Sequence, residues 1–372
     1  MKYKSIVAIL TLLVAFTLVL SACAAPAPQV VEVEKTVVVE KEVEVVSTVV
    51  VEKEVVAETF DASTVLGGMK MAAVLSGPVN DAGWNTNAYL ALTEARDNYG
   101  IDIAYTESVK VEDAAQVMRD YAEAGYTIIM AHGYEYADQA IEVAKEYPDI
   151  KFIHTNGVAS DIPNLYTVGF SVGEGGYFMG WLACKISQSG KVGFIIGTQF
   201  PAVEHQVKMA RAACADTGSN AEVVDTYVGS WADPAKTKEL AKAAIEQGTD
   251  VIIMLADAGD TGGIEAAKEA YDAGNTNLRI ISWVKDKNYL GPEFVLGGWS
   301  ENVALEVDTM LQLIAQNQPG GHFALGMQEN VVYTNPMYGL VPQEVELEFV
   351  DMVQKYLADP SSLPSLEVRK DL

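Results

Sequence analysis

The sequence predicts an α/β protein that contains two doubly wound parallel sheets. Short apolar, strand-like runs alternate with amphipathic, helix-like segments, and this alternation occurs as two successive series. Parallel strands need helical crossovers, so each series is expected to build one parallel sheet with helices on both faces. A chain of 372 residues is long enough to bury a core in each of two such units.

The first series begins after residue 66 and carries five strand-like runs. Its predicted strands are separated by helices at 88–99, 114–124 and 137–147, and they cover residues 69–75, 101–108, 126–132, 150–156 and 165–170. The second series opens with a helix rather than a strand. Its predicted helices are 175–187, 203–216, 234–247 and 263–273, and its strands are 191–197, 221–228, 250–256 and 278–284.

The N-terminal segment is expected to be processed rather than folded. Lys2 and Lys4 precede an apolar run over residues 6–20, which is too short for a comfortable membrane span and is typical of a signal peptide. The run ends in Leu-Ser-Ala-Cys, which resembles a bacterial lipobox and predicts a lipid on Cys23. Residues 1–23 are therefore assigned to a lipoprotein signal peptide, and the mature chain is predicted to lie outside the cytoplasmic membrane, tethered to it.

A low-complexity stalk is predicted at residues 24–58, where Val, Glu and Lys dominate. The octamer TVVVEKEV occurs at 36–43 and again at 48–55, a period of twelve residues that is neither a heptad nor a steady alternation. This pattern favours a spacer between the lipid and the folded part of the chain.

The charge and the motifs exclude several functions. The formal net charge of −26 argues against nucleic acid or anionic lipid as a binding partner and mildly disfavours phosphorylated ligands. The chain has no Gly-x-Ser-x-Gly motif and no His-Glu-x-x-His motif, and its four histidines lack metal-ligand spacing. No catalytic residue, metal or cofactor is predicted.

The loops that follow the predicted strands carry aromatic, amide and carboxylate side chains among glycines. Ligands bind outside the carboxyl ends of parallel strands, so these loops are the expected site. The first of them, 77–88, holds a large aromatic, Trp84, that turn chemistry does not require. A planar small molecule with polar edges is the ligand that such a lining predicts.

Several segments, which span most of 66–342, carry recognisable motifs: NDAGWN at 80–85, GEGGYFMGWLA at 173–183, KVGFIIG at 191–197, and YVGSWADPAKTKELA at 227–241. Together they resemble the basic membrane protein family of substrate-binding lipoproteins, whose members include nucleoside receptors. The resemblance implies a type I periplasmic-binding-protein fold, with two lobes joined by a hinge of three crossovers. The expected N-terminal lobe is 59–166 plus 292–322, and the expected C-terminal lobe is 167–291 plus 323–372.

By the same resemblance, the chain is a substrate-binding protein of an ABC importer that clamps a purine base or nucleoside-like heterocycle between its lobes. Its expected partners are the ABC permease with its ATPase and the membrane, and a monomer is expected by analogy. The residues predicted to contact the ligand are Asn80, Asp81, Trp84, Asn85, Tyr134, Asn156, Phe170, Trp231, Asp257 and Trp283.

Two departures from the family pattern bear on the ligand. Nucleoside-binding members carry Asp where this chain has Asn156, and another Asp in a segment that here reads Ser282-Trp283-Val284. An amide both donates and accepts hydrogen bonds, whereas a carboxylate only accepts, so Asn156 has a different hydrogen-bond preference. The loss of the second Asp to Val284 and the gain of Trp283 favour a bare base over a nucleoside.

Alternatives remain for both function and site. A sugar receptor uses the same stacking and polar groups, and a tethered sensor could present its bound form to a membrane kinase. Individual site residues could instead have structural roles: Trp84 could pack against the helix behind it, and Asp257 could cap a helix N-terminus. Cys184 and Cys214 lie in helix-like segments and are expected to be free buried thiols, although a bridge is not excluded.

Overall fold

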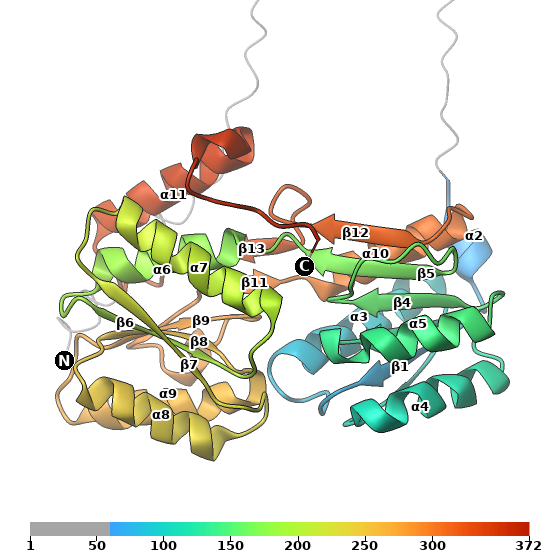
Figure 1. The fold of residues 1–372 in the computed structure, drawn as a ribbon, viewed down its shortest axis with the longest axis horizontal. Coiled ribbons are helices and arrows are strands. Elements are labelled where there is room, and N and C mark those ends of the chain that lie inside the picture. The colour runs from blue at the N-terminus through green and yellow to red at the C-terminus, as the bar shows by residue number, and fades with distance from the viewer. Residues whose placement is uncertain (1–59, 372) are drawn as a thin grey trace, which may run out of the picture. The chain divides into compact units, whose positions relative to one another are not determined.

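The computed structural model describes residues 60–371 (Figure 1). The predicted α/β class with two parallel sheets is confirmed. The predicted signal peptide, Cys23 and the stalk lie outside the described residues, and so do the terminal residues 59 and 372 of the predicted lobes.

The first sheet has the strand order β12-β5-β4-β3-β1-β2, and all its neighbours pair in parallel. Its strands are β1 (Lys70–Leu75), β2 (Asp102–Thr106), β3 (Ile128–His132), β4 (Lys151–Thr155), β5 (Leu165–Phe170) and β12 (Gly321–Leu325). The central strands β1 and β3 are almost wholly buried, as expected for a sheet that helices cover on both faces.

The second sheet has the order β10-β9-β8-β6-β7 and is also parallel throughout. Its strands are β6 (Lys191–Ile196), β7 (Glu222–Tyr227), β8 (Val251–Leu255), β9 (Arg279–Ser282) and β10 (Val295–Leu296). A third, two-stranded antiparallel sheet pairs β11 (Trp299–Glu301) with β13 (Val332–Thr334).

Helices cover both faces of each large sheet. On the first sheet, one core contains residues of α3 (Trp84–Tyr99) and α10 (Val303–Ala315), and the other contains residues of α4 (Val111–Glu123) and α5 (Ala137–Glu146). On the second sheet, α6 (Glu174–Ile186) and α7 (Pro201–Asp216) lie on one face, and α8 (Pro234–Glu246) and α9 (Asp260–Asp272) lie on the other (Figure 1). The short α2 (Ser63–Leu66) adds Leu66 to the first of these cores, and α11 (Gln343–Ala358) packs on α6.

Both sheets reverse their strand order at one point, and this determines where a ligand can bind. In the first sheet β2 lies beyond β1 on one side, and β4, β5 and β12 lie beyond β3 on the other side. In the second sheet β7 lies beyond β6, and β9 and β10 lie beyond β8 on the other side. A crevice opens at such a switch point, outside the carboxyl ends of the two strands. The register aligns those ends, because Leu75 pairs with His132 and Ile196 pairs with Leu255.

The chain passes between the two sheets three times, after β5, around β11 and around β13. The lobe limits predicted from the sequence stay a prediction. We propose limits that keep every strand whole, with crossovers after Phe170, after Leu296 and after Leu325. These limits assign β10 to the C-terminal lobe and all of β12 to the N-terminal lobe.

The expectation of two free thiols was wrong. Cys184 and Cys214 form a disulfide between α6 and α7, with their Cα atoms 5.3 Å apart. The two helices approach closely because glycines of α6 face the backbone of α7 one and two turns earlier. A Cβ on Gly180 would lie 2.4 Å from the Cα of Ala210, and a Cβ on Gly176 would lie 2.0 Å from the carbonyl oxygen of Gln206. Residues four apart share one face of a helix, so the same close approach brings the two cysteines together.

No helix in the described part of the chain is both long and apolar enough to cross a membrane.

Candidate functional site

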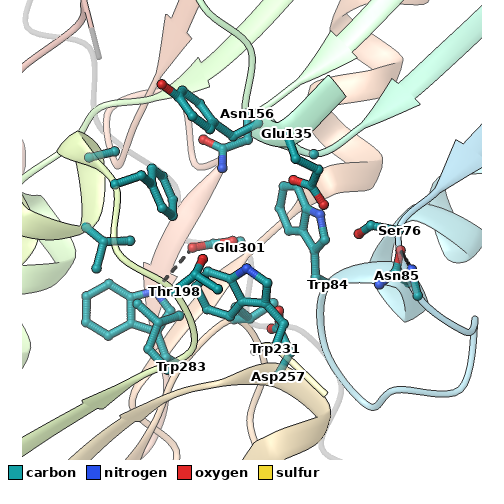
Figure 2. Close-up of a pocket in the computed structure, with 18 of the residues that line it drawn as sticks. Ser76, Trp84, Asn85, Glu135, Asn156, Thr198, Trp231, Asp257, Trp283 and Glu301 are labelled. Atoms are coloured by element: carbon teal, nitrogen blue, oxygen red, sulfur yellow. Dashed lines mark hydrogen bonds between the residues drawn. The ribbon is translucent and has the colours of Figure 1, made fainter. Parts of the chain in front are cut away.

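A cavity of about 600 Å³ lies at the carboxyl ends of the strands that flank the two switch points. Figure 2 shows aromatic, amide and carboxyl side chains around it. Nine of the ten residues predicted to contact the ligand line this cavity: Asp81, Trp84, Asn85, Tyr134, Asn156, Phe170, Trp231, Asp257 and Trp283. The tenth, Asn80, is exposed in the same loop and is not among the lining residues.

The loop between β1 and α3 is braced by Asp81. Its buried carboxylate accepts hydrogen bonds from the backbone of Gly83, Asn85 and Thr86, and also from the side chains of Asn85 and Thr86. These donors include amide groups at the start of α3, which have no partner within the helix. Asn85 completes the brace by accepting from the backbone N–H of Gly77 at 3.2 Å. Asp81 and Asn85 therefore line the cavity, but their polar atoms are largely engaged in shaping the loop.

Trp84, the first residue of α3, is half-buried and stacks on His132 at the end of β3. The ring centroids lie 4.0 Å apart and the rings are inclined by 18°. Both imidazole nitrogens of His132 are engaged, Nδ1 with the Thr155 hydroxyl at 2.6 Å and Nε2 with the Trp84 carbonyl at 3.0 Å. Burial lowers the pKa of His132 to about 3, so a neutral ring supports one face of the indole. Phe170 meets Trp84 edge-on, with centroids 6.0 Å apart.

A second group of aromatic rings comes from loops of both sheets. Tyr134, which follows β3, stacks on Phe200, which precedes α7, with centroids 5.0 Å apart. Phe200 also meets Trp231 edge-on at 6.4 Å. A Cβ on Gly197 would lie 2.1 Å from the Trp231 ring, so only glycine lets this indole lie against the end of β6. The contact between Tyr134 and Phe200 joins the two lobes beside the cavity.

Asn156 and Asp257 both follow strands and both adopt the left-handed backbone region, with φ of 52° and 50°. Asn and Asp tolerate this region better than most residues do. Asp257 Oδ1 is buried and has no hydrogen-bond partner, and burial raises the pKa of this carboxyl well above its ordinary value. The Asp257 side chain also lies across the lobe boundary from Gly83, where an added Cβ would be 3.1 Å from Oδ1.

Trp283 forms part of the cavity wall but belongs mainly to the core. It is 1% exposed, and its ring packs against Phe194 and Trp299. Its indole N–H donates to Glu301 Oε1 at 3.2 Å (Figure 2). The next residue, Val284, is buried with a φ of 68°, a strained conformation for a β-branched side chain.

The sequence analysis missed several lining residues. Phe200 and Glu135 stand in strand-end loops of the kind that predicted the site, and that position was the available signal. Glu301 gave no such signal, because it lies on β11, in a crossover between the lobes. Its pKa is raised by burial to about 7, with the bond from Trp283 acting in the opposite direction.

Comparisons with known proteins agree with this fold. A family model described as "ABC transporter substrate-binding protein PnrA-like" matches residues 69–366. Among curated relatives, the transcriptional activator protein med of Bacillus subtilis is 27% identical over 294 residues, which is 77% of this chain and 88% of that protein. The ABC transporter nucleoside-binding protein BmpA of Lactococcus lactis is 28% identical over 282 residues, 72% of this chain and 80% of that protein.

A purine-binding protein of Brucella abortus is 30% identical over 205 residues, which is 54% of this chain and 57% of that protein. Among solved structures, an ABC transporter solute-binding protein of Aeropyrum pernix superposes with a TM-score of 0.67 at 19% identity, covering 80% of this chain and 89% of that one. A transcriptional activator of the comK gene from Bacillus halodurans gives 0.65 at 24% identity, covering 79% and 99%. These structural matches confirm the type I periplasmic-binding-protein fold.

Proposed function

Because the chain belongs to the PnrA-like family of ABC transporter substrate-binding proteins, we propose that it captures a purine base or nucleoside-like heterocycle and presents it to an ABC permease. The family consists of binding receptors rather than enzymes. The observation that carries the proposal is the cavity, where aromatic rings from the loops of both sheets surround a space with amide and carboxyl groups at its edges. The relatives named for nucleoside and purine binding point to the same ligand class.

The aromatic rings account for the planar part of the ligand. Stacking one base on an aromatic ring contributes about 1–3 kcal/mol. Trp84 is held in place by His132 behind it, so little conformational entropy is lost when a base stacks on its other face. Two stacking faces and a few edge hydrogen bonds give about −8 kcal/mol, which corresponds to micromolar affinity.

The closed arrangement of the lobes accounts for retention of the ligand. Tyr134 stacks on Phe200 and Gly83 lies against Asp257, so the two lobes already touch beside the cavity. A ligand favours the closed form only through contacts that are stronger in that form. A heterocycle touching Trp84 on one lobe and Trp231 on the other meets this condition.

We also propose that the mature protein works on the outer face of the cytoplasmic membrane, anchored by lipid on Cys23. The lipobox-like sequence and the preceding apolar run support this location. Metabolic labelling with a tritiated fatty acid tests it, because the label should enter the wild-type protein and be absent from Cys23→Ala.

The ligand class is tested by a thermal-shift screen of the full-length protein, purified in mild detergent, against purine bases, nucleosides, pentoses and hexoses. Ligand at a hundredfold excess over Kd stabilises the folded state by about 2.7 kcal/mol, which gives a clear rise in Tm. A rise with a purine supports the proposal. A rise with a sugar and with no purine would replace it by a sugar receptor.

A variant of Trp84 tests the site itself. Trp84→Ala should weaken purine binding by about tenfold or more, because it removes one stacking surface, while Trp84→Phe should keep most of the affinity. Tyr289→Ala is the matched control, since Tyr289 is an exposed aromatic that does not line the cavity. Unfolding of Trp84→Ala at room temperature would show instead that the indole serves packing.

A further inference from the structure

The residues that line the cavity have an uneven charge. Four carboxyl side chains line it, and no Lys, Arg or His does so among the described residues. Asp81 is satisfied by the hydrogen bonds of its own loop. The other three, Glu135, Asp257 and Glu301, come from the first lobe, the second lobe and the crossover strand β11 (Figure 2).

Of these three carboxyl groups, Asp257 most clearly lacks a hydrogen-bond partner. Its side chain lines the cavity, and its Oδ1 is buried against Gly83 and accepts no hydrogen bond. Leaving a buried carboxyl oxygen without a donor destabilises the folded protein, and the cost is greater when the group is charged. A neutral purine satisfies such an oxygen with one N–H, whereas a cationic ligand also supplies the opposite charge.

The nearest buried cation does not fill this role. Lys287 Nζ donates to Asp260 Oδ2 at 2.6 Å and to the Trp283 carbonyl at 3.0 Å, and the side chains of Lys287 and Asp260 are 2% and 1% exposed. This pair is neutral as a unit. Asp257 therefore has no cation bonded directly to its carboxyl group.

The aromatic rings favour the same kind of ligand. The face of an indole or phenyl ring attracts a cation, and Trp gives the strongest attraction. Trp84, Phe170 and Trp231 line the cavity together with Asp257, Glu135 and Glu301, and no cationic side chain of the described residues lines it. Aromatic faces together with carboxyls that lack a cationic partner recognise a delocalised positive charge, whereas a neutral base requires only the rings and one or two polar atoms.

We propose that this cavity selects heterocycles that carry a positive charge over neutral heterocycles of the same size, with Asp257, Glu135 and Glu301 as the residues that determine this preference. The inference rests on the proposed function and narrows its ligand class to cationic nitrogen heterocycles, such as ring-alkylated purines. Hydrogen bonds to an ionised group are about twice as strong as neutral ones. We therefore expect a preference of at least tenfold in Kd.

Two isomeric nucleosides provide the test, because 1-methyladenosine is a cation at neutral pH and N6-methyladenosine is neutral. Isothermal titration calorimetry of the full-length protein at pH 7.5 should give a Kd for the cation at least tenfold lower than for its isomer. Equal affinities, or tighter binding of the neutral isomer, would overturn the inference and leave the proposed function standing. Failure to bind either isomer or any other purine would overturn both.

Charge-neutralising variants identify the residues responsible. Asp257→Asn should lose the preference for 1-methyladenosine, a change of about tenfold in the ratio of the two Kd values. Glu135→Gln should reduce the same ratio. Asp102→Asn is the control, since Asp102 is exposed on β2 and does not line the cavity. If Asp257→Asn weakens both isomers equally, Asp257 has only a structural role and the inference is wrong.

Discussion

Replacing Glu301 by Gln should make the protein more stable at neutral pH. In the folded chain burial raises the pKa of Glu301 from its ordinary value of 4.5 to about 7. A shift of one pKa unit corresponds to about 1.4 kcal/mol, so ionising this carboxyl in the folded state costs about 3 kcal/mol. Gln keeps the size of the side chain and can still accept the hydrogen bond from Trp283.

The sign of the effect depends on pH. Below pH 4.5 Glu301 is protonated in both the folded and the unfolded chain, and the two proteins should have similar free energies of unfolding. Between pH 4.5 and 7 the unfolded chain ionises while the folded chain keeps its proton, so the stability contributed by this group falls as pH rises. Above pH 7 the full cost is present, and Glu301→Gln should exceed the wild type by up to about 3 kcal/mol.

Urea denaturation of both proteins from pH 4.5 to 8, without ligand, measures this difference. The informative quantity is the difference between the two free energies of unfolding, because the contributions of all other titrating groups cancel in it. Glu112→Gln, on the exposed face of α4, is the control. A difference that does not vary with pH, or that favours the wild type increasingly above pH 7, would refute the reasoning.

Three further predictions concern the framework of the site. The double variant Cys184→Ala/Cys214→Ala should lose about 3.6 kcal/mol in urea denaturation, the chain-entropy value for a loop of 30 residues, and reduction of the wild type should show a similar loss. Gly180→Ala should lower the free energy of unfolding by about 1–3 kcal/mol, because its Cβ would overlap the backbone of α7. Gly321→Ala, which has open space around it, should lower the free energy of unfolding by less than about 1 kcal/mol. Equal losses in the two variants would contradict the close helix contact. Asp81→Ala should lower the free energy of unfolding by about 1–2 kcal/mol, and it should weaken the binding of both methyladenosine isomers by the same factor, because it loosens the loop that carries Trp84. A selective loss of 1-methyladenosine binding in calorimetry would be the contrary result.

Local sequence determined the framework of this protein. Each helix that the alternation of apolar runs and amphipathic segments predicted differs from an observed helix by only a few residues, for example 137–147 against Ala137–Glu146, whereas α10 and α11 were not predicted. It also predicted that the loops after the strands would meet, because parallel strands place their carboxyl ends at one edge. Such patterns depend on spacings of two to four residues, which can be read along the chain.

The tertiary structure decided what each side chain in those loops does. Asp81 and Asp257 both follow strands and look alike in the sequence. Asp81 accepts hydrogen bonds from the amides of its own loop, whereas Asp257 has a buried oxygen that accepts none. Glu301 reaches the cavity from a crossover strand that no local pattern marks. The bridge between Cys184 and Cys214 depends on how closely two helices approach. Burial, desolvation and pairing are set by neighbours distant in the sequence, so they are known only once the chain has folded.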